Sequence, residues 1–197
     1  MKTIKLMSFL LAAGTLFIGC SDDDNDIPEA VNPEEVITTM NVTLNAPSGN
    51  EVTFKSYDSD GDGPNAPVIT VSGPLVANTI YSGELELLNE SDPAAIENTT
   101  LEIMEEADEH QFFFAKSDAL NTSFTYTDTE ADYISGSDSV DPVGIAFTLS
   151  TAEASSGTIS ITLIHEPAKD ASGVADGDIT NAAGETDFVA TFPITVQ

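Results

Sequence analysis

Both histidines of the chain stand next to carboxylates. His110 ends an acidic run that includes Glu106 and Glu109, and His165 is followed by Glu166. Imidazole nitrogens and carboxylate oxygens are ligands that zinc and copper accept in proteins. If the strands that carry the two histidines are neighbours, His110, His165 and one or two of the three glutamates could form a transition-metal site for zinc, copper or nickel. The alternative is two surface histidines hydrogen-bonded to nearby carboxylates, and the sequence leaves both interpretations open.

A second group of carboxylates has the spacing of a calcium loop. Asp58, Asp60 and Asp62 occupy alternate positions, and Gly63 follows in sixth place. Oxygen ligands at this spacing converge on one hard cation when the backbone turns tightly, which glycine allows. Ile69 occupies the twelfth position, where an EF-hand needs a bidentate glutamate, so the segment is not an EF-hand. It predicts either a calcium site of another kind or a hydrophilic turn.

The single cysteine lies where a bacterial lipoprotein carries its lipid. Residues 1–19 have a positive start and an apolar run from Leu6 to Ile18, which is too short to span a membrane, and Gly19 directly precedes Cys20. This pattern is typical of a lipoprotein signal peptide. It predicts Cys20 as the acylated N-terminus through which the protein contacts the membrane. The alternative is an ordinary cleaved signal peptide with a spare thiol.

The segment that follows, residues 20–35, predicts a flexible acidic tether. Aspartates follow Cys20 and Ser21 from residue 22 onward, and Pro28 and Pro33 come later in the segment. Like charges keep such a linker extended. An acidic run directly after a lipidated cysteine resembles the export signal of surface lipoproteins in some gram-negative bacteria. We therefore expect a lipid-anchored protein of the outer membrane that is exposed at the cell surface.

The charge of the chain excludes several classes of function. It has 34 Asp plus Glu against five Lys plus Arg, a formal net charge of −29. Nucleic-acid binding requires lysines and arginines against the phosphates, so no nucleic-acid partner is expected. The negative field instead attracts cations.

Signatures of catalysis are missing from the sequence. It has neither the GxSxG of a serine hydrolase nor the HExxH of a zinc protease. Glycoside hydrolysis requires two carboxylates that face each other about 5–10 Å apart, which a chain this acidic leaves open. The absence of Trp makes a sugar-stacking platform poor. We expect a non-enzymatic protein and keep a surface-polymer hydrolase as the least favoured alternative.

Residues 36–197 predict a single all-β domain. Apolar and polar residues alternate with a period of two in short runs that Gly, Pro, Asn or Asp interrupt. Nine such runs predict strands, at 36–44, 51–57, 66–71, 80–88, 111–116, 123–127, 144–150, 158–165 and 187–196. This number of short strands favours an antiparallel β-sandwich, immunoglobulin-like in architecture. Residues 98–110 predict either a short helix, with Thr99 and Glu102 as a capping box, or an irregular crossover.

Several motifs together resemble one group of proteins. The segments CSDDDND, DSDGDGPNAP, EEADEHQFFF, ITLIHEPAK and GDITNAAGETDF are similar to those of small acidic lipoproteins from gram-negative surfaces. Some members of that group carry the label of a type 1 periplasmic binding fold. The label implies a two-lobed α/β solute binder, whereas the strand pattern favours the β-sandwich. The resemblance implies no catalytic residues.

Three functions follow from these observations as hypotheses. The leading one is a surface-anchored lipoprotein whose β-sandwich binds a small ligand or a partner protein and is stabilised by calcium. The first alternative is capture of a transition metal by the two histidines and their carboxylates. The second alternative is the hydrolase described above.

Overall fold

The computed structural model describes residues 36–59 and 65–197. The predicted signal peptide, Cys20 and the acidic tether lie outside the described residues, as do Asp60 and Asp62 of the calcium loop. Within these residues no helix is both long and apolar enough to cross a membrane.

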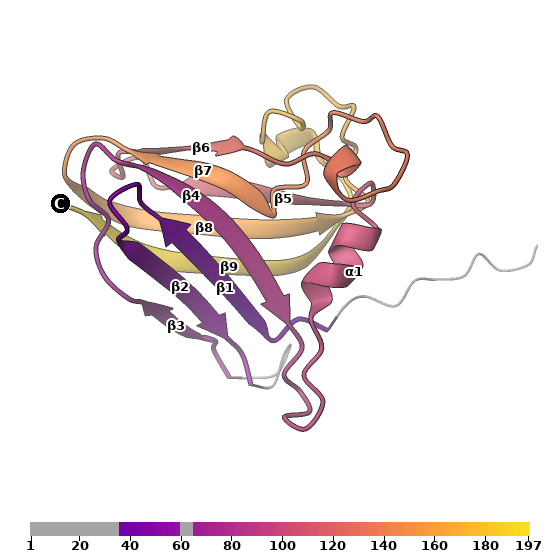
Figure 1. The fold of residues 1–197 in the computed structure, drawn as a ribbon, viewed down its shortest axis with the longest axis horizontal. Helices are drawn as coiled ribbons and strands as arrows, with labels where there is room; N and C mark the ends of the chain where they lie inside the picture. Colours follow the sequence, from indigo (N-terminus) through magenta and orange to yellow (C-terminus); the bar gives the residue numbers. More distant parts are fainter. Residues whose placement is uncertain (1–35, 60–64) are drawn as a thin grey trace, which may run out of the picture. The chain divides into compact units, whose positions relative to one another are not determined.

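Nine strands of the described chain form two antiparallel sheets that pack face to face (Figure 1). They are β1 (Thr39–Asn45), β2 (Glu51–Tyr57), β3 (Val68–Val71), β4 (Ile80–Leu88), β5 (His110–Lys116), β6 (Thr122–Tyr126), β7 (Ala146–Thr151), β8 (Ser155–His165) and β9 (Glu185–Val196). The larger sheet has the order β3-β2-β1-β4-β7-β6, and the smaller has the order β5-β8-β9. The predicted all-β sandwich is confirmed, and each predicted strand coincides with an observed one to within a few residues.

Alternation along each strand explains the shared core between the sheets. In β4, Tyr81, Leu85 and Leu87 are buried, whereas Ser82, Glu84 and Glu86 alternate with the buried positions and face solvent. In β9, Phe192 and Ile194 repeat the pattern from the opposite sheet. Each large apolar side chain removed from water contributes roughly 1.5–3 kcal/mol, so these two inner faces supply the main driving force for folding.

A short helix, α1 (Thr99–Glu105), stands at the end of the sandwich where β8 ends (Figure 1). Its N-cap is Asn98, whose side chain accepts a hydrogen bond from the backbone of Thr100 at 3.1 Å. The predicted capping box on Thr99 is therefore wrong by one residue, because the asparagine before it provides the cap. Thr100 also joins the helix to β4, where its hydroxyl accepts a bond from the backbone of Leu87 at 2.7 Å. The predicted short helix is confirmed.

A long loop after β8 covers the outer face of the smaller sheet. Phe113 of β5 and Ile164 of β8 point to that face and pack against Val174 and Ala182 of the loop. Two single-turn 3-10 helices, η1 (Glu130–Asp132) and η2 (Ile179–Asn181), belong to the connections at the same end of the domain. The ends of β5, β8 and β9 are therefore enclosed by loops and by α1.

The two sheets are linked by different kinds of hydrogen bond at the two open sides of the sandwich. On the β3–β9 side, Leu75 exchanges backbone hydrogen bonds with the end of β9, to Thr195 at 2.8 Å and from Gln197 at 2.9 Å. On the opposite side, β5 and β6 are the edge strands of their sheets. There the link comes from side chains, because the Tyr126 hydroxyl donates to the carbonyl of Phe112 at 2.7 Å.

Candidate metal centre

The two histidines are direct cross-strand neighbours. His110 begins β5 and His165 ends β8, and the two are partners in the antiparallel register. Their rings stack with centroids 4.7 Å apart and an interplanar angle of 7°. The structure thus meets the condition that the sequence left open, which was adjacency of the strands that carry His110 and His165.

Both rings lie on the core side of the smaller sheet. His110 has the same orientation along β5 as the buried Phe112, and His165 has the same orientation along β8 as the buried Leu163. Side chains two residues apart in a strand share a face. His110 is therefore fully enclosed, while His165 at the strand end keeps 13% of its side chain exposed.

A third polar side chain, Asp187 of β9, completes the group. The alternation of β9 directs Ala190 and Phe192 inward, so Asp187 should face solvent. However, the β8–β9 register shifts between Leu163 and Ile164, whose paired residues are Phe188 and Thr186, so Asp187 is the extra residue of a bulge. A bulge re-aims the side chain that it contains. The Asp187 carboxylate consequently lies 1% exposed, with Oδ2 3.8 Å from Nε2 of His110.

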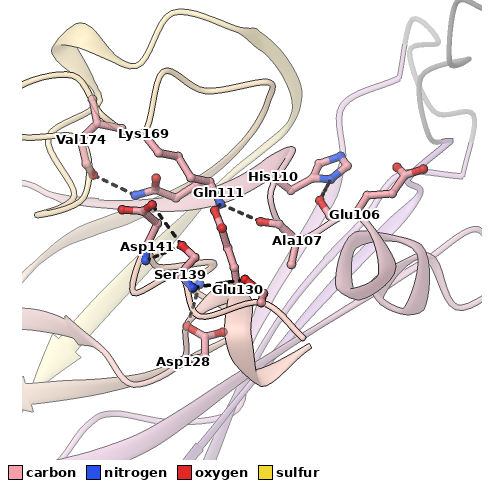
Figure 2. Close-up of polar contacts among 12 residues, drawn as sticks. Glu106, Ala107, His110, Gln111, Asp128, Glu130, Ser139, Asp141, Lys169 and Val174 are labelled. Carbon is pink, nitrogen blue, oxygen red and sulfur yellow. Dashed lines mark hydrogen bonds and ion pairs between the residues drawn. The ribbon is translucent and has the colours of Figure 1, made fainter. Parts of the chain in front are cut away.

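The orientation of His110 is set by helix α1. Nδ1 of His110 lies 3.0 Å from the backbone carbonyl oxygen of Glu106, as Figure 2 shows. A carbonyl oxygen only accepts, so Nδ1 carries the hydrogen and donates it. In the neutral ring Nε2 is then the nitrogen that can accept or bind a metal, which is the arrangement found for metal-binding histidines whose other nitrogen is held by a second group.

Two of the predicted glutamates, Glu109 and Glu166, lie close to the solvent-facing side of His165. Nε2 of His165 lies 3.6 Å from Oε2 of Glu109, and Glu109, His165 and Glu166 form a second group of ligand atoms within 4.8 Å of one another. Glu166 adopts a positive φ of 50°, an uncommon conformation for a residue with a side chain. Its backbone donates to the carbonyl of Glu109 at 2.6 Å, which holds the two glutamates together.

The remaining predicted ligands are placed differently. Glu106 contributes its backbone carbonyl to His110, whereas its carboxylate extends away from the ring (Figure 2) and belongs to neither ligand group. Asp58, at the end of β2, donates through its backbone to the carbonyl of Thr38 at 2.8 Å. Asp60 and Asp62 lie outside the described residues, so the calcium loop stays a prediction.

The distances between the ligand atoms of His110, His165 and Asp187 can be compared with those around a bound zinc ion. Their three ligand atoms lie within 4.8 Å of one another. A tetrahedral zinc ion with bonds of about 2.0–2.1 Å separates neighbouring ligands by about 3.4 Å. The donors must therefore converge by about 1 Å on loading. Two imidazoles and one carboxylate suit zinc or copper rather than calcium, which prefers oxygen ligands throughout.

A second buried polar cluster adjoins the histidines and supports the same corner of the fold (Figure 2). The Lys169 ammonium donates to Oε1 of Glu130 at 2.7 Å and to the carbonyl of Ala107 at 2.6 Å. Burial lowers the pKa of Lys169 below its ordinary value, and the hydrogen bond and charge of Glu130 act in the opposite direction. The lysine thereby ties the loop after β8 to η1 and to the turn that leads into His110.

Asp128 holds the neighbouring loops from the other side of this cluster. Its carboxylate accepts from the backbone of Gly144 at 2.8 Å, the backbone of Ala146 at 2.9 Å and the hydroxyl of Tyr133 at 2.9 Å. Burial and the charge of Asp128 raise the pKa of the Tyr133 phenol. Sequence analysis identified none of Asp128, Lys169 or Asp187, because nothing in their local pattern separates them from the other charged residues of the chain.

No match to this chain was found among protein-family models, curated proteins or solved structures. No ligand and no activity is therefore transferred to it from a relative. The similarity to acidic surface lipoproteins stays an expectation from the sequence motifs.

Proposed function

We propose that this protein is a surface lipoprotein whose β-sandwich binds a divalent transition-metal ion, zinc or copper, through His110, His165 and Asp187. The observation that carries the proposal is the cross-strand pair formed by the two histidines of the chain, with the buried Asp187 carboxylate beside them. Either Glu109 or Glu166 could add a second carboxylate ligand, because both are grouped with His165 on its solvent-facing side. Metal capture is thus favoured over an unspecified ligand-binding role.

Electrostatics support a cation at this position. A buried carboxylate beside two imidazole nitrogens is costly unless a proton or a metal ion neutralises it. The net charge of −29 raises the local concentration of cations around the whole molecule. The exposed side chain of Glu109 and the partly exposed His165 lie on the side from which an ion would reach the buried donors.

Calorimetric titration with Zn²⁺, Cu²⁺ and Ca²⁺ tests the proposal. The protein is used with Cys20→Ser, which removes the only thiol as a competing ligand. We expect one Zn²⁺ or Cu²⁺ per chain, and we expect His165→Gln and Asp187→Asn each to weaken binding by more than about 100-fold, because each removes a direct ligand. Ca²⁺ should not compete for the histidines.

Glu51→Gln is the matched control for these variants. It removes one exposed carboxylate from β2, far along the chain from the histidines, and should leave the affinity unchanged. If neither Zn²⁺ nor Cu²⁺ binds, or if wild type and His165→Gln bind the metal with equal affinity, the proposed metal site is contradicted. Comparable losses in Glu51→Gln and Asp187→Asn would show that only the overall charge attracts the ions.

The lipid anchor is tested independently by palmitate labelling in a gram-negative host. We expect label in the wild type and none in Cys20→Ser, because the acyl chains require that thiol. Equal labelling of the two proteins would reject the lipoprotein assignment without affecting the metal site.

The pocket at the edges of β5 and β6, described below, does not support the hydrolase alternative. It is lined by a single carboxylate, Asp176. Glycoside hydrolysis needs two carboxylates that flank the bond to be cleaved. The pocket therefore lacks the pair that this mechanism requires.

A further inference from the structure

The open side of the sandwich contains a pocket between two sheet edges. β5 is the edge of the smaller sheet and β6 is the edge of the larger, and residues of both strands line the pocket. The pocket has a volume of about 490 Å³ and is lined from both strands and from the loop around Gly177. Phe114 and Phe124 form its apolar floor, with rings stacked 4.8 Å apart.

The pocket continues along β6. A second pocket of about 310 Å³ shares Lys116, Thr122 and Ser123 with the first and extends past them to Asn121. We call the two together the β5–β6 groove. Its elongated outline follows the edge strand, which suits an extended chain better than a compact ligand.

Backbone groups on both sides of the groove lack a partner strand. The backbone of Phe112 in β5 donates outward to Val143, and that of Ser117, directly after β5, donates inward to Thr158 of β8. Outward-facing backbone groups recur at every second residue, so those of Phe114 and Lys116 also point away from β8. In the part of the chain that the structure describes, no strand pairs with this side of β5.

The same reasoning applies to β6. The backbone of Thr127 donates to Ala146 on the β7 side, so the backbone groups of Phe124 point away from β7 and toward the groove. Unpaired strand edges are templates on which another chain adds as a new strand. Two such edges thus flank one apolar floor.

The buried hydroxyl of Thr122 in the groove also supports the binding of a ligand there. Thr122 is 7% exposed and lines both pockets. Its Oγ1 has no hydrogen-bond partner among residues 36–59 and 65–197. A buried polar atom without a partner is unfavourable, so a ligand that supplies a donor or acceptor gains from this position.

We propose that the β5–β6 groove binds an extended basic peptide segment of a partner protein by strand addition. The backbone of the peptide would pair with the outward groups of Phe114 and Lys116 or of Phe124, and alternate apolar side chains would rest on the phenylalanine floor. The lining carries one cation, Lys116, and one carboxylate, Asp176, so it is nearly neutral itself. The net charge of −29 therefore selects a basic partner.

Fluorescence anisotropy with capped synthetic peptides tests this proposal in buffer with EDTA, which separates it from the metal site. The probe is a labelled peptide of alternating lysine and valine. One comparison peptide has the same sequence with methyl groups on alternate backbone nitrogens, and the other has glutamate in place of lysine. We expect binding of the first peptide alone, because N-methylation removes the donors of a strand and glutamate is repelled.

Two substitutions at one position separate backbone pairing from side-chain contact. Lys116→Pro removes an outward N–H without touching the bonds to β8, since proline is tolerated on an edge strand. Lys116→Ala removes the side chain and keeps the N–H. We expect Lys116→Pro to weaken peptide binding about tenfold, and Lys116→Ala to bind at least as tightly as wild type. Thermal melts establish that both variants remain folded.

Several results would overturn the proposal. These are no binding of the lysine peptide, equal binding of its N-methylated form, equal binding of the glutamate peptide, or a folded Lys116→Pro variant that binds like wild type.

Discussion

Lys169 and Glu130 form an ion pair with side chains that are only 7% and 9% exposed. Charges removed from water in this way are tolerated because each neutralises the other and because the ammonium also donates to Ala107. The pair links three segments around the histidines. Its energetic value lies mainly in avoiding an isolated buried charge.

A double-mutant cycle measures this dependence. We expect Lys169→Met and Glu130→Leu each to lower the free energy of unfolding in urea by about 3–5 kcal/mol, because each leaves one buried charge without its partner. The double variant should lose much less than the sum of the two, since it leaves no charge behind. Strictly additive losses would show that the two side chains act independently.

At the scale of elements, the packing of β4 against β7 depends on a glycine. Gly83 of β4 is the register partner of Phe147 in β7. A Cβ atom on Gly83 would lie 2.4 Å from two ring carbons of Phe147. The ring has little room to move, because it is fully buried and packs against Phe114 and Phe124.

Gly83→Ala should therefore lower the free energy of unfolding by about 1–3 kcal/mol through overpacking. Gly73→Ala is the matched control, because a Cβ there has nothing within 4 Å, and its effect should stay within about 0.5 kcal/mol. Chemical denaturation of both variants checks the prediction. Phe147→Leu in the Gly83→Ala background should recover part of the loss, and equal effects of the two alanine variants would contradict the steric explanation.

At the scale of the whole molecule, Tyr126 joins the two sheets across their open side. Its hydroxyl donates to Phe112 of the opposite sheet. Burial raises the pKa of Tyr126 to about 12, the hydrogen bond with Gln111 lowers it, and the charge of Asp128 raises it. Ionisation of this phenol would remove the donor and place a negative charge in a buried position close to Asp128.

This shift predicts alkaline destabilisation. The stability that the protonated phenol contributes is fully present below pH 10, the ordinary pKa of tyrosine, and is lost as pH rises toward about 12. In that window the unfolded chain releases the proton first, so the free energy of unfolding falls by about 1.4 kcal/mol per pH unit. The lowered pKa of Lys169 has the opposite sign, but its contribution ends near its ordinary value of 10.5. Urea unfolding between pH 10.5 and 12 isolates the tyrosines.

Tyr126→Phe should flatten this pH dependence while it lowers stability at neutral pH by about 1 kcal/mol, the value of one hydrogen bond. Part of the slope should remain, because the pKa of Tyr133 is also raised. Tyr57→Phe at the end of β2 is the control, and a slope that Tyr126→Phe and Tyr57→Phe change equally would argue against the inter-sheet role.

Local alternation was enough to predict the strands and the sandwich, because period-two patterning depends only on which neighbours of a residue are apolar. The same alternation orients His110 with Phe112 and His165 with Leu163. The helix cap was missed by one residue because Asn98 and Thr99 are both good N-cap residues. The charge and the lone cysteine likewise come from the sequence and suggest a cation-attracting, lipid-anchored protein.

Tertiary structure alone decided how these parts meet. The pairing of β5 with β8 brings two distant histidines into register, and long-range pairing leaves no trace in the local pattern of either strand. The bulge in β9 turns Asp187 from its expected solvent face to the histidines, because one inserted residue reverses the orientation of its side chain. The β5–β6 groove likewise exists only because the free edges of two different sheets come together.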